Sequence, residues 1–220
     1  MIKQTILCCA LLSLLSCNSK PTANTNDLLE EKNTASTETP VDQNLVEDIE
    51  NPKVEDNLSS FVPKNYEILL KEEGDINLDG LQDVILVLKQ SYEDSRYEDT
   101  GESPQRPVLL LVRDSNGKLQ QARRNDKTVY GIGDGGMMGD PFTSIAIKNG
   151  YFSFEHYGGS SWRWTHIVTY KYDKNENEWF LHKVGGDSFH ASEPEKVETK
   201  VKSTKDFGKI KFEKFDIFKN

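Results

Sequence analysis

Cysteine is almost absent from this chain of 220 residues, and its three copies, Cys8, Cys9 and Cys17, all lie within the first seventeen residues. The remaining residues therefore cannot form an intramolecular disulfide or a thiolate metal site. A folded domain with neither must be held together by the burial of apolar side chains, to which a bound metal can add.

Clustered basic side chains are also lacking. The net charge is −9, and roughly −7 of it falls in residues 18–60. Because binding to a phosphate backbone requires clustered Lys and Arg, the composition argues against nucleic acid as a partner. Hydrophobic residues make up 35% of the chain, fewer than in most globular proteins, which indicates that part of the chain does not fold.

The motifs of common hydrolases are missing as well. The sequence has no Gly-x-Ser-x-Gly, no His-Glu-x-x-His and no cysteine nucleophile after residue 17. Its four histidines are scattered without metal-ligand spacing. These absences favour a binding or interaction module over an enzyme. They leave open the alternative of a hydrolase that acts on envelope polysaccharide or peptide.

What the N-terminus does contain is the pattern of an exported protein. Lys3 supplies a positive charge, and residues 6–15 form an apolar run that suits a signal peptide and is too short to span a bilayer. The following Leu14-Leu15-Ser16-Cys17 resembles the lipobox of bacterial lipoproteins. The resemblance implies that residues 1–16 are a lipoprotein signal peptide and that Cys17 becomes the lipidated first residue. An ordinary cleaved signal peptide is the alternative.

The lipobox resemblance also implies a place in the cell. Two or more acyl chains give stable membrane anchoring, so the expected partner is a membrane reached through the lipid anchor. Asn18 follows Cys17, whereas an Asp at this position of lipoproteins favours retention in the inner membrane. The expected localisation is therefore the cell envelope, with the outer membrane favoured.

Residues 17–60 are expected to form a lipidated, disordered and acidic tether. This stretch is rich in Asn, Thr, Ser, Glu and Asp, shows no sustained helix or strand period, and cannot bury enough apolar area to offset its ordering entropy. A short helix over residues 27–32 is the alternative. Residues 61–220 are expected to form a single β-rich domain.

From Phe61 onward, short apolar runs alternate with polar residues and are separated by turn signals, which predicts β-strands. Asn149-Gly150 is the strongest hairpin signal. No long amphipathic helix is expected. The predicted fold is all-β and antiparallel, in the form of a curled sheet, a sandwich or a small barrel. The expected strands are 66–71, 83–89, 108–113, 119–124, 143–148, 151–156, 162–172, 178–184, 197–202 and 210–212.

The most specific chemical pattern runs from Asp75 to Asp83. Side-chain oxygens recur at Asp75, Asn77 and Asp79, a glycine follows, and Asp83 comes four residues after the third oxygen. Calcium prefers six to eight oxygen ligands, and alternate positions of a tight loop can converge on one ion. The backbone carbonyl near Leu81 can add a further ligand. The sequence therefore predicts a structural calcium ion held by this loop.

This loop resembles the calcium loops of FG-GAP and VCBS-type repeats, in which an Asp-x-Asn-x-Asp-Gly-x-x-Asp hairpin leads into a strand. It departs from the EF-hand, because Leu86 stands at the twelfth loop position, where an EF-hand has Glu. The pattern occurs once, so the repeated propeller fold is not implied. The alternative is a turn in which Asp and Asn only accept backbone hydrogen bonds.

Two further segments are candidates for ligand binding. The glycine-rich loop 131–142 lacks the Gly-Lys-Ser/Thr ending of phosphate loops and is expected to be mobile or to face a ligand. In the hairpin 156–164, Trp162 and Trp164 share one strand face and could form an aromatic platform, with Arg163 or His156 as a polar partner for a sugar or peptide. The alternative is that both tryptophans belong to the core.

The order of these features resembles that of uncharacterised exported bacterial β-rich proteins, over about residues 65–190. That resemblance implies a common fold and no activity. The expected function is thus a membrane-anchored extracytoplasmic lipoprotein with a calcium-stabilised binding domain for an envelope glycan or protein. The alternative hydrolase would use the glycine-rich loop and the aromatic hairpin as its cleft.

Overall fold

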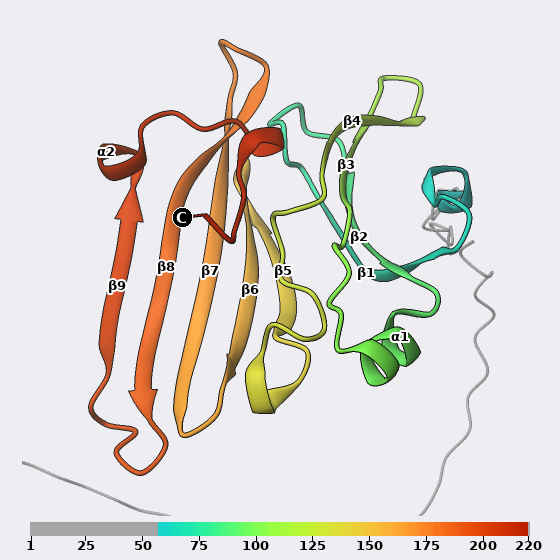
Figure 1. The fold of residues 1–220 in the computed structure, drawn as a ribbon. Coiled ribbons are helices and arrows are strands. Elements are labelled where there is room, and N and C mark those ends of the chain that lie inside the picture. The colour runs from blue at the N-terminus through green and yellow to red at the C-terminus, as the bar shows by residue number, and fades with distance from the viewer. Residues whose placement is uncertain (1–56, 220) are drawn as a thin grey trace, which may run out of the picture. The chain divides into compact units, whose positions relative to one another are not determined.

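The computed structural model describes residues 57–219. The predicted signal peptide, Cys17 and the tether as far as residue 56 lie outside the described residues. Residues 57–219 form two antiparallel sheets that do not close into a barrel, and Figure 1 shows the two sheets facing each other. The all-β fold class is thereby confirmed, in its sandwich-like form.

The first sheet is a meander of four strands in the order β1-β2-β3-β4. The turn between β3 and β4 begins at Asp114, whose Oδ1 accepts the N–H groups of Asn116 and Lys118 at 2.9 and 3.0 Å. Such local acceptance of backbone donors is how Asp specifies a tight turn. The strands are β1 (Tyr66–Gly74), β2 (Asp83–Gln90), β3 (Val108–Arg113) and β4 (Leu119–Asn125).

The second sheet has five strands in the order β5-β6-β7-β8-β9, again with every neighbour antiparallel. Asn149 and Gly150 join β5 to β6 with φ values of 52° and 72°, the left-handed conformation that favours Asn-Gly in a two-residue hairpin. The strands are β5 (Phe142–Lys148), β6 (Tyr151–Gly159), β7 (Trp162–Asp173), β8 (Glu178–His190) and β9 (Glu198–Ser203).

Helical segments are short and lie between strands or after the last strand. The longest in the described residues, α1, ends at Gly101, whose φ of 70° provides the left-handed cap. Within residues 57–219, no helix has the length and apolar character needed to cross a membrane. The segments are η1 (Leu58–Phe61), α1 (Glu93–Thr100), η2 (Gly136–Met138), α2 (Thr204–Phe207) and η3 (Phe212–Lys214).

The main core lies between the two sheets and is closed by the C-terminal segment. Val87 and Leu110 of the first sheet and Phe154 and Tyr170 of the second are all fully buried in it. Tyr170 keeps a hydrogen-bond partner, because its hydroxyl lies 2.6 Å from Oγ1 of Thr128. The C-terminal segment contributes Phe212, Phe215 and Ile217 to the same cluster.

A second, smaller apolar cluster covers the other face of the four-stranded sheet. Leu86 and Leu109 are buried there beneath Leu58 and Phe61 of η1. β2 therefore has a buried residue on both faces, which explains why residues 84–88 are continuously apolar instead of alternating. Leu58 precedes residue 61, where the folded domain was expected to begin, and already packs on the sheet.

The predicted strands correspond to β1–β9, but β8 continues six residues beyond the predicted 178–184 and the expected last strand, 210–212, is not formed. Lys211 makes a single antiparallel bridge with Phe180, and Phe212 then begins η3. The chain turns inward at this point because Phe212, Phe215 and Ile217 fill the core between the sheets. A continuous strand would have placed Phe212 on the opposite face from Phe215 and Ile217.

Candidate functional site: an aromatic groove on the five-stranded sheet

One face of β7 begins in the core and continues beyond it. Tyr170 and Val168 are fully buried, His166 and Trp164 are half-buried, and Trp162 is 58% exposed. Because alternate residues of a strand share a face, all five side chains lie on the inner side of the sheet. The inner face of β7 is therefore covered by the core near Tyr170 and uncovered near Trp162, where its aromatic side chains are accessible to solvent.

Tyr130 forms one wall of this exposed region. Its ring centroid lies 5.7 Å from that of Trp164, 5.6 Å from that of His166 and 5.6 Å from that of Phe218. Trp164 and Phe218 meet Tyr130 edge to face, a favourable arrangement for aromatic pairs. Residues distant in sequence, from after β4, from β7 and from the C-terminal segment, thus build one aromatic cluster.

Two glycines create the space beside these rings. Gly158 lies directly beneath the indole of Trp164, since a Cβ on this glycine would stand 2.4 Å from Cζ2 of the indole. Gly186 lets β8 approach β7, because its Cβ would stand 2.1 Å from the carbonyl oxygen of Thr165. The indole of Trp164 thus occupies the space over Gly158, and Gly186 leaves the sheet face open next to Trp164 and His166.

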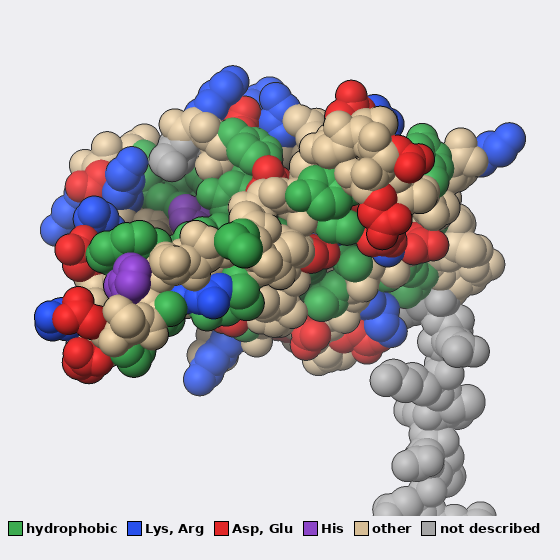
Figure 2. All heavy atoms as spheres, turned by 60° about the horizontal axis from the view of Figure 1, so that its bottom comes forward, with side chains coloured by type: hydrophobic (Ala, Val, Ile, Leu, Met, Phe, Trp, Pro, Cys, Tyr) green, Lys and Arg blue, Asp and Glu red, His purple; other side chains and the backbone are tan. Residues whose placement is uncertain are grey.

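The resulting groove has a volume of about 250 Å³. It lies over β7, β8 and the edge strand β9, and Lys200 and Lys202 of β9 line it. Figure 2 shows a histidine recessed in a hollow at this end of the molecule, with basic side chains along the rim. Pockets for whole drug-sized ligands measure roughly 300–1,000 Å³, so the groove suits one ring or a single terminal group.

His166 gives the groove an unusual polar group. Its Nε2 atom is buried and has no hydrogen-bond partner in residues 57–219. Burial lowers the pKa of His166, so the ring is neutral near pH 7. A neutral imidazole nitrogen can donate or accept one hydrogen bond. Buried polar atoms without a partner are rare, and one beside a groove points towards a ligand contact.

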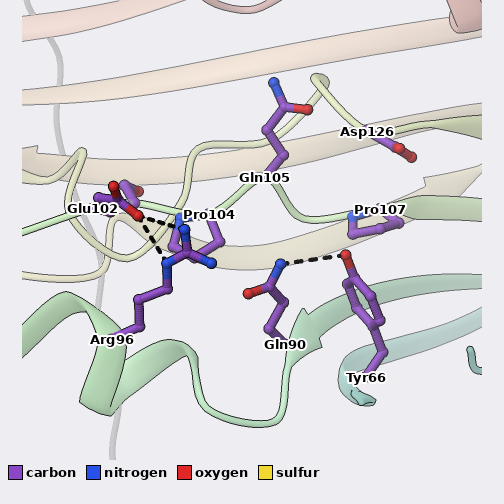
Figure 3. A pocket seen from close by; sticks show the side chains of 9 residues that line it. Tyr66, Gln90, Arg96, Glu102, Pro104, Gln105, Pro107 and Asp126 are labelled. Atoms are coloured by element: carbon purple, nitrogen blue, oxygen red, sulfur yellow. Dashed lines mark hydrogen bonds and ion pairs between the residues drawn. The ribbon is translucent and has the colours of Figure 1, made fainter. Parts of the chain in front are cut away.

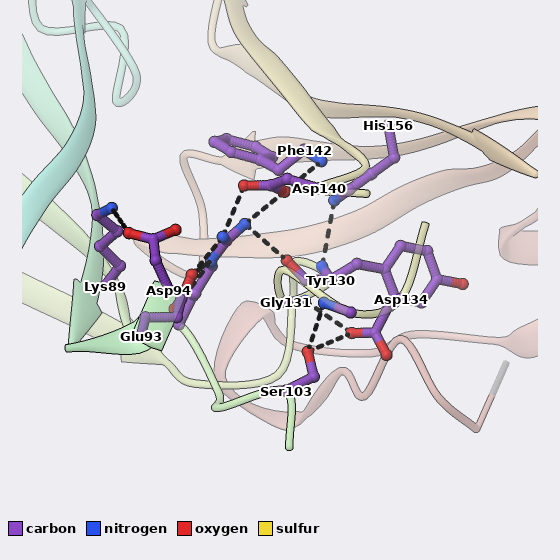
Figure 4. Close-up of polar contacts among 12 residues, drawn as sticks. Lys89, Glu93, Asp94, Ser103, Tyr130, Gly131, Asp134, Asp140, Phe142 and His156 are labelled. Atoms are coloured by element: carbon purple, nitrogen blue, oxygen red, sulfur yellow. Dashed lines mark hydrogen bonds and ion pairs between the residues drawn. The ribbon is translucent and has the colours of Figure 1, made fainter. Parts of the chain in front are cut away.

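Both ring nitrogens of His156, by contrast, are hydrogen-bonded within the protein. Its Nδ1 donates to the main-chain oxygen of His166 at 3.0 Å, and its Nε2 accepts the N–H of Tyr130 at 3.3 Å, a contact drawn in Figure 4. The side chain is 2% exposed, and its burial lowers its pKa to about 4. His156 therefore holds Tyr130 in position from behind the groove and offers no free nitrogen to a ligand.

The other predicted binding residues of the hairpin are divided between the two faces of β7. Trp162 and Trp164 lie on the groove side, and Trp162 meets the ring of His190 edge to face with centroids 5.3 Å apart. Arg163 points to the opposite side and its guanidinium contacts the sulfur of Met138. The structure thus brings Trp162 and Trp164 to one face and does not place Arg163 or His156 beside them.

The glycine-rich loop 131–142 is fixed by a buried arginine that the sequence analysis did not single out. Arg106 donates to Asp140 of the loop at 2.8 and 2.7 Å and to Glu93 of α1. Arg106 and Glu93 are 1% and 0% exposed. Burial alone would lower the pKa of Arg106, but the two carboxylates outweigh it and the pKa is raised.

The predicted calcium loop lies between β1 and β2, and its oxygens accept backbone hydrogen bonds. Oδ1 of Asp75 accepts the N–H of Leu78 at 2.6 Å, and its Oδ2 accepts that of Gly80 at 2.9 Å. Oδ1 of Asp79 accepts the N–H of Leu81 at 2.8 Å, and Oδ2 of Asp79 accepts Nδ2 of Asn77 at 2.7 Å. These bonds are those of a stable Asx-type turn.

Asp83 closes the loop from within the protein. It is fully buried, and its carboxylate accepts the N–H groups of Ile76 at 3.1 Å and Arg113 at 2.9 Å. Burial raises the pKa of Asp83, and the nearby charges of Asp75 and Asp79 raise it further. Among the described residues, no group of three or more acidic, histidine or cysteine side chains is placed to hold a metal. The loop thus has the carboxylate and amide oxygens of a calcium site at the expected sequence positions, and most of these oxygens accept hydrogen bonds from backbone N–H groups.

A second cavity, of about 500 Å³, lies near the start of β1 and the end of β2. Figure 3 shows its lining, in which the amide of Gln90 reaches the hydroxyl of Tyr66 at 3.5 Å and Arg96 pairs with Glu102. The guanidinium and carboxylate neutralise each other, and no tryptophan or histidine lines this cavity. It therefore lacks the tryptophan and histidine that distinguish the groove.

The fold and the groove define a sandwich-like all-β domain with an open aromatic site on the longer sheet. No protein-family model, curated protein or solved structure matches the chain when it is compared with each of them. The geometry of residues 57–219 is therefore the basis for the functional argument.

Proposed function

We propose that this chain is a cell-envelope lipoprotein whose β-sandwich domain binds a glycan or a protein of the envelope in the groove beside Trp164. One observation carries the proposal. The inner face of β7 leaves the core still lined with aromatic rings, and the buried Nε2 of His166 has no partner there. Aromatic faces accompanied by a few polar groups are typical of ligand sites.

Binding can be measured with a chain that starts at residue 18, which retains every residue of the described core. Envelope glycans and envelope proteins would be screened by calorimetry and by the change in tryptophan fluorescence. The Trp164→Ala variant should lose binding because it removes the ring that the groove presents. Ile167→Ala is the matched control, since Ile167 is exposed on the opposite face of β7. Equal loss in both variants would contradict the proposal.

The alternative of an envelope hydrolase receives less support from the site. A hydrolase of the acyl-transfer type needs a nucleophile hydrogen-bonded to a base. His166 stands beside Trp164, but its Nε2 bonds to no hydroxyl or other group of the described residues. Asp187 and Glu198 line the groove, and the Asp187 carboxylate accepts the hydroxyl of Thr199 at 2.6 Å. Turnover of envelope polysaccharide that disappears in His166→Ala would favour the enzyme.

The anchor completes the proposed function. Its support is the lipobox at Cys17 and the short apolar run before it. Cys17→Ser should prevent lipidation and release the chain from membranes, whereas Cys9→Ser should leave lipidation unchanged. Fractionation of inner and outer membranes would then test the proposed outer-membrane location. Retention of the Cys17→Ser chain on membranes would contradict the anchor.

We also propose that calcium binds the Asp75 loop and stabilises it. Support comes from the three carboxylates of Asp75, Asp79 and Asp83: burial raises the pKa of Asp83, and repulsion by Asp79 and Asp75 raises it further. A divalent cation would relieve this repulsion and would be held by carboxylate and amide oxygens, the ligands that calcium prefers. The ion would join the end of β1 to the start of β2, which makes its proposed role structural.

A further inference from the structure

We infer that the groove selects an acidic saccharide, with one sugar ring packed against Trp164 and its carboxylate or phosphate paired with Lys200 and Lys202. This inference rests on the proposed function, and it names the ligand class of the same groove. Its support is the position of the two lysines, the charge around them and the chemistry of the aromatic wall.

The two lysines reach the groove because of the register between β8 and β9. Lys202 pairs with Val184, and Lys200 pairs with Gly186. Val184 faces the core. Lys202, opposite Val184, and Lys200, two residues before Lys202, therefore lie on the same inner face of the sheet. Both lysines are therefore next to the hollow that Gly186 leaves open.

The charges of these lysines remain available to an anion. Lys202 forms no salt bridge with another residue of the described part of the chain, and Lys200 contacts only Glu198, at 3.8 Å. The two side chains of that contact are 85% and 68% exposed, and such an exposed pair contributes little. A carboxylate or phosphate bound between Lys200 and Lys202 would form a closer and better-enclosed interaction.

The groove also lies in the basic part of an acidic chain. Residues 196–220 contain eight lysines and four carboxylates, although the whole chain has a net charge of −9. Lys200 and Lys202 of this segment line the groove together with Asp187 and Glu198. The Asp187 carboxylate already accepts the hydroxyl of Thr199, and Glu198 makes only the exposed 3.8 Å contact with Lys200, so Lys202 is the lining cation that has no salt bridge within the described residues.

The remaining groups fit a sugar better than a peptide. Trp164 offers an apolar ring face, and the unpartnered Nε2 of His166 can bond to a sugar hydroxyl. The volume of about 250 Å³ is suited to one ring. An extended peptide would gain most from pairing with the free edge of β9, which is the last strand of the sheet. That edge lies at the border of the sheet, not over the face that carries Trp164.

The test uses the chain from residue 18 in calorimetric titrations with a glucuronic acid trisaccharide, with glucose 6-phosphate and with a neutral glucose trisaccharide. The acidic trisaccharide or the sugar phosphate should bind at least tenfold more tightly than the neutral one. Raising the salt concentration should weaken that binding, because salt screens exposed charges. Stronger binding of the uronic acid or of the phosphate identifies the preferred anion.

The variants separate this inference from the function on which it rests. Lys200→Gln with Lys202→Gln should lower affinity for the acidic ligand at least tenfold and leave the melting temperature unchanged. Lys183→Gln with Lys205→Gln is the control, since neither lysine lines the groove. If neutral and acidic sugars bind equally, and the Lys200→Gln, Lys202→Gln double variant binds as the unaltered chain does, this inference is overturned. The proposed function would still stand if that binding requires Trp164. Trp164-dependent binding of an envelope peptide alone would also overturn the inference. No ligand from either screen would overturn both.

Discussion

His156 and His166 face each other across β6 and β7, and the Nδ1 of His156 donates to the main-chain oxygen of His166 over 3.0 Å. The same imidazole accepts the N–H of Tyr130 through Nε2. One buried neutral ring therefore connects the sheet to Tyr130, whose ring packs against Trp164 and His166 beside the groove. Protonation of this ring would replace the acceptor at Nε2 with a donor facing the N–H of Tyr130.

We therefore predict that the free energy of unfolding decreases as pH falls from about 6.5 to about 4. An unfolded histidine takes up its proton near pH 6.5, whereas burial lowers the pKa of His156 in the fold to about 4. Between these values the unfolded chain binds more protons, so acid favours unfolding. The loss from His156 alone should be about 3 kcal/mol. Urea unfolding at a series of pH values measures it.

The contribution of His156 is isolated by comparing variants. His156→Gln should reduce the pH dependence between 4 and 6.5 and leave the part due to His166, whose pKa burial also lowers, while His190→Gln at the far end of β8 should preserve the full dependence. Asp83 acts in the opposite direction, because its raised pKa makes the fold bind more protons, and it is unchanged in both variants. If His156→Gln retains the full pH slope, the assigned role of His156 is wrong.

A second prediction concerns the buried pair of Arg106 and Glu93. Glu93→Gln should destabilise the protein by about 1–3 kcal/mol, because it removes one of the two carboxylates that neutralise an arginine that is 1% exposed, while Asp140 remains as the other. Chemical denaturation provides the measurement. Glu102→Gln is the control, since Glu102 pairs with Arg96 at the surface and should change stability by about 1 kcal/mol or less. Similar effects of the two variants would contradict a special role for the buried pair.

The strands could be predicted from the sequence because local signals determine them. The alternation of residue types that gives β6 its alternating burial, and the Asn149-Gly150 turn before it, can both be read from a short window of sequence. The continuous run 84–88 also indicated a strand, but not that η1 and the second sheet cover its two faces. Such coverage depends on contacts between distant segments, which no single-window pattern contains.

The groove was only partly predictable for the same reason. The shared face of Trp162 and Trp164 follows from the two-residue period of a strand. The burial of His156 and the approach of Tyr130 to Trp164 depend on how segments far apart in sequence pack together. Lys200 and Lys202 had no distinctive motif, and only the register of β9 against β8 places them at the groove.

A third prediction tests calcium at the Asp75 loop. Adding calcium to chelator-treated protein should raise its melting temperature by several degrees, since a ligand that binds only the folded state stabilises it. Asp83→Asn should remove this shift. Asp114→Asn should retain it, because Asp114 accepts backbone N–H groups in a comparable turn between β3 and β4 that lacks the acidic pattern. No calcium-dependent shift in the unaltered chain would rule out the site.

The last prediction uses Gly158 to move the aromatic ring of the groove without removing it. A Cβ at Gly158 would stand 2.4 Å from Cζ2 of Trp164, closer than real Cβ contacts, so Gly158→Ala should push the indole away from β6. Affinity for the groove ligand should fall, and tryptophan emission should change. Gly74→Ala introduces a comparable clash with the side chain of Ile147, at 2.7 Å, and is the matched control. Because both added methyl groups meet side chains and not backbone, both variants should fold. If ligand affinity falls equally in both, the position of Trp164 does not determine binding, and the groove is not the site.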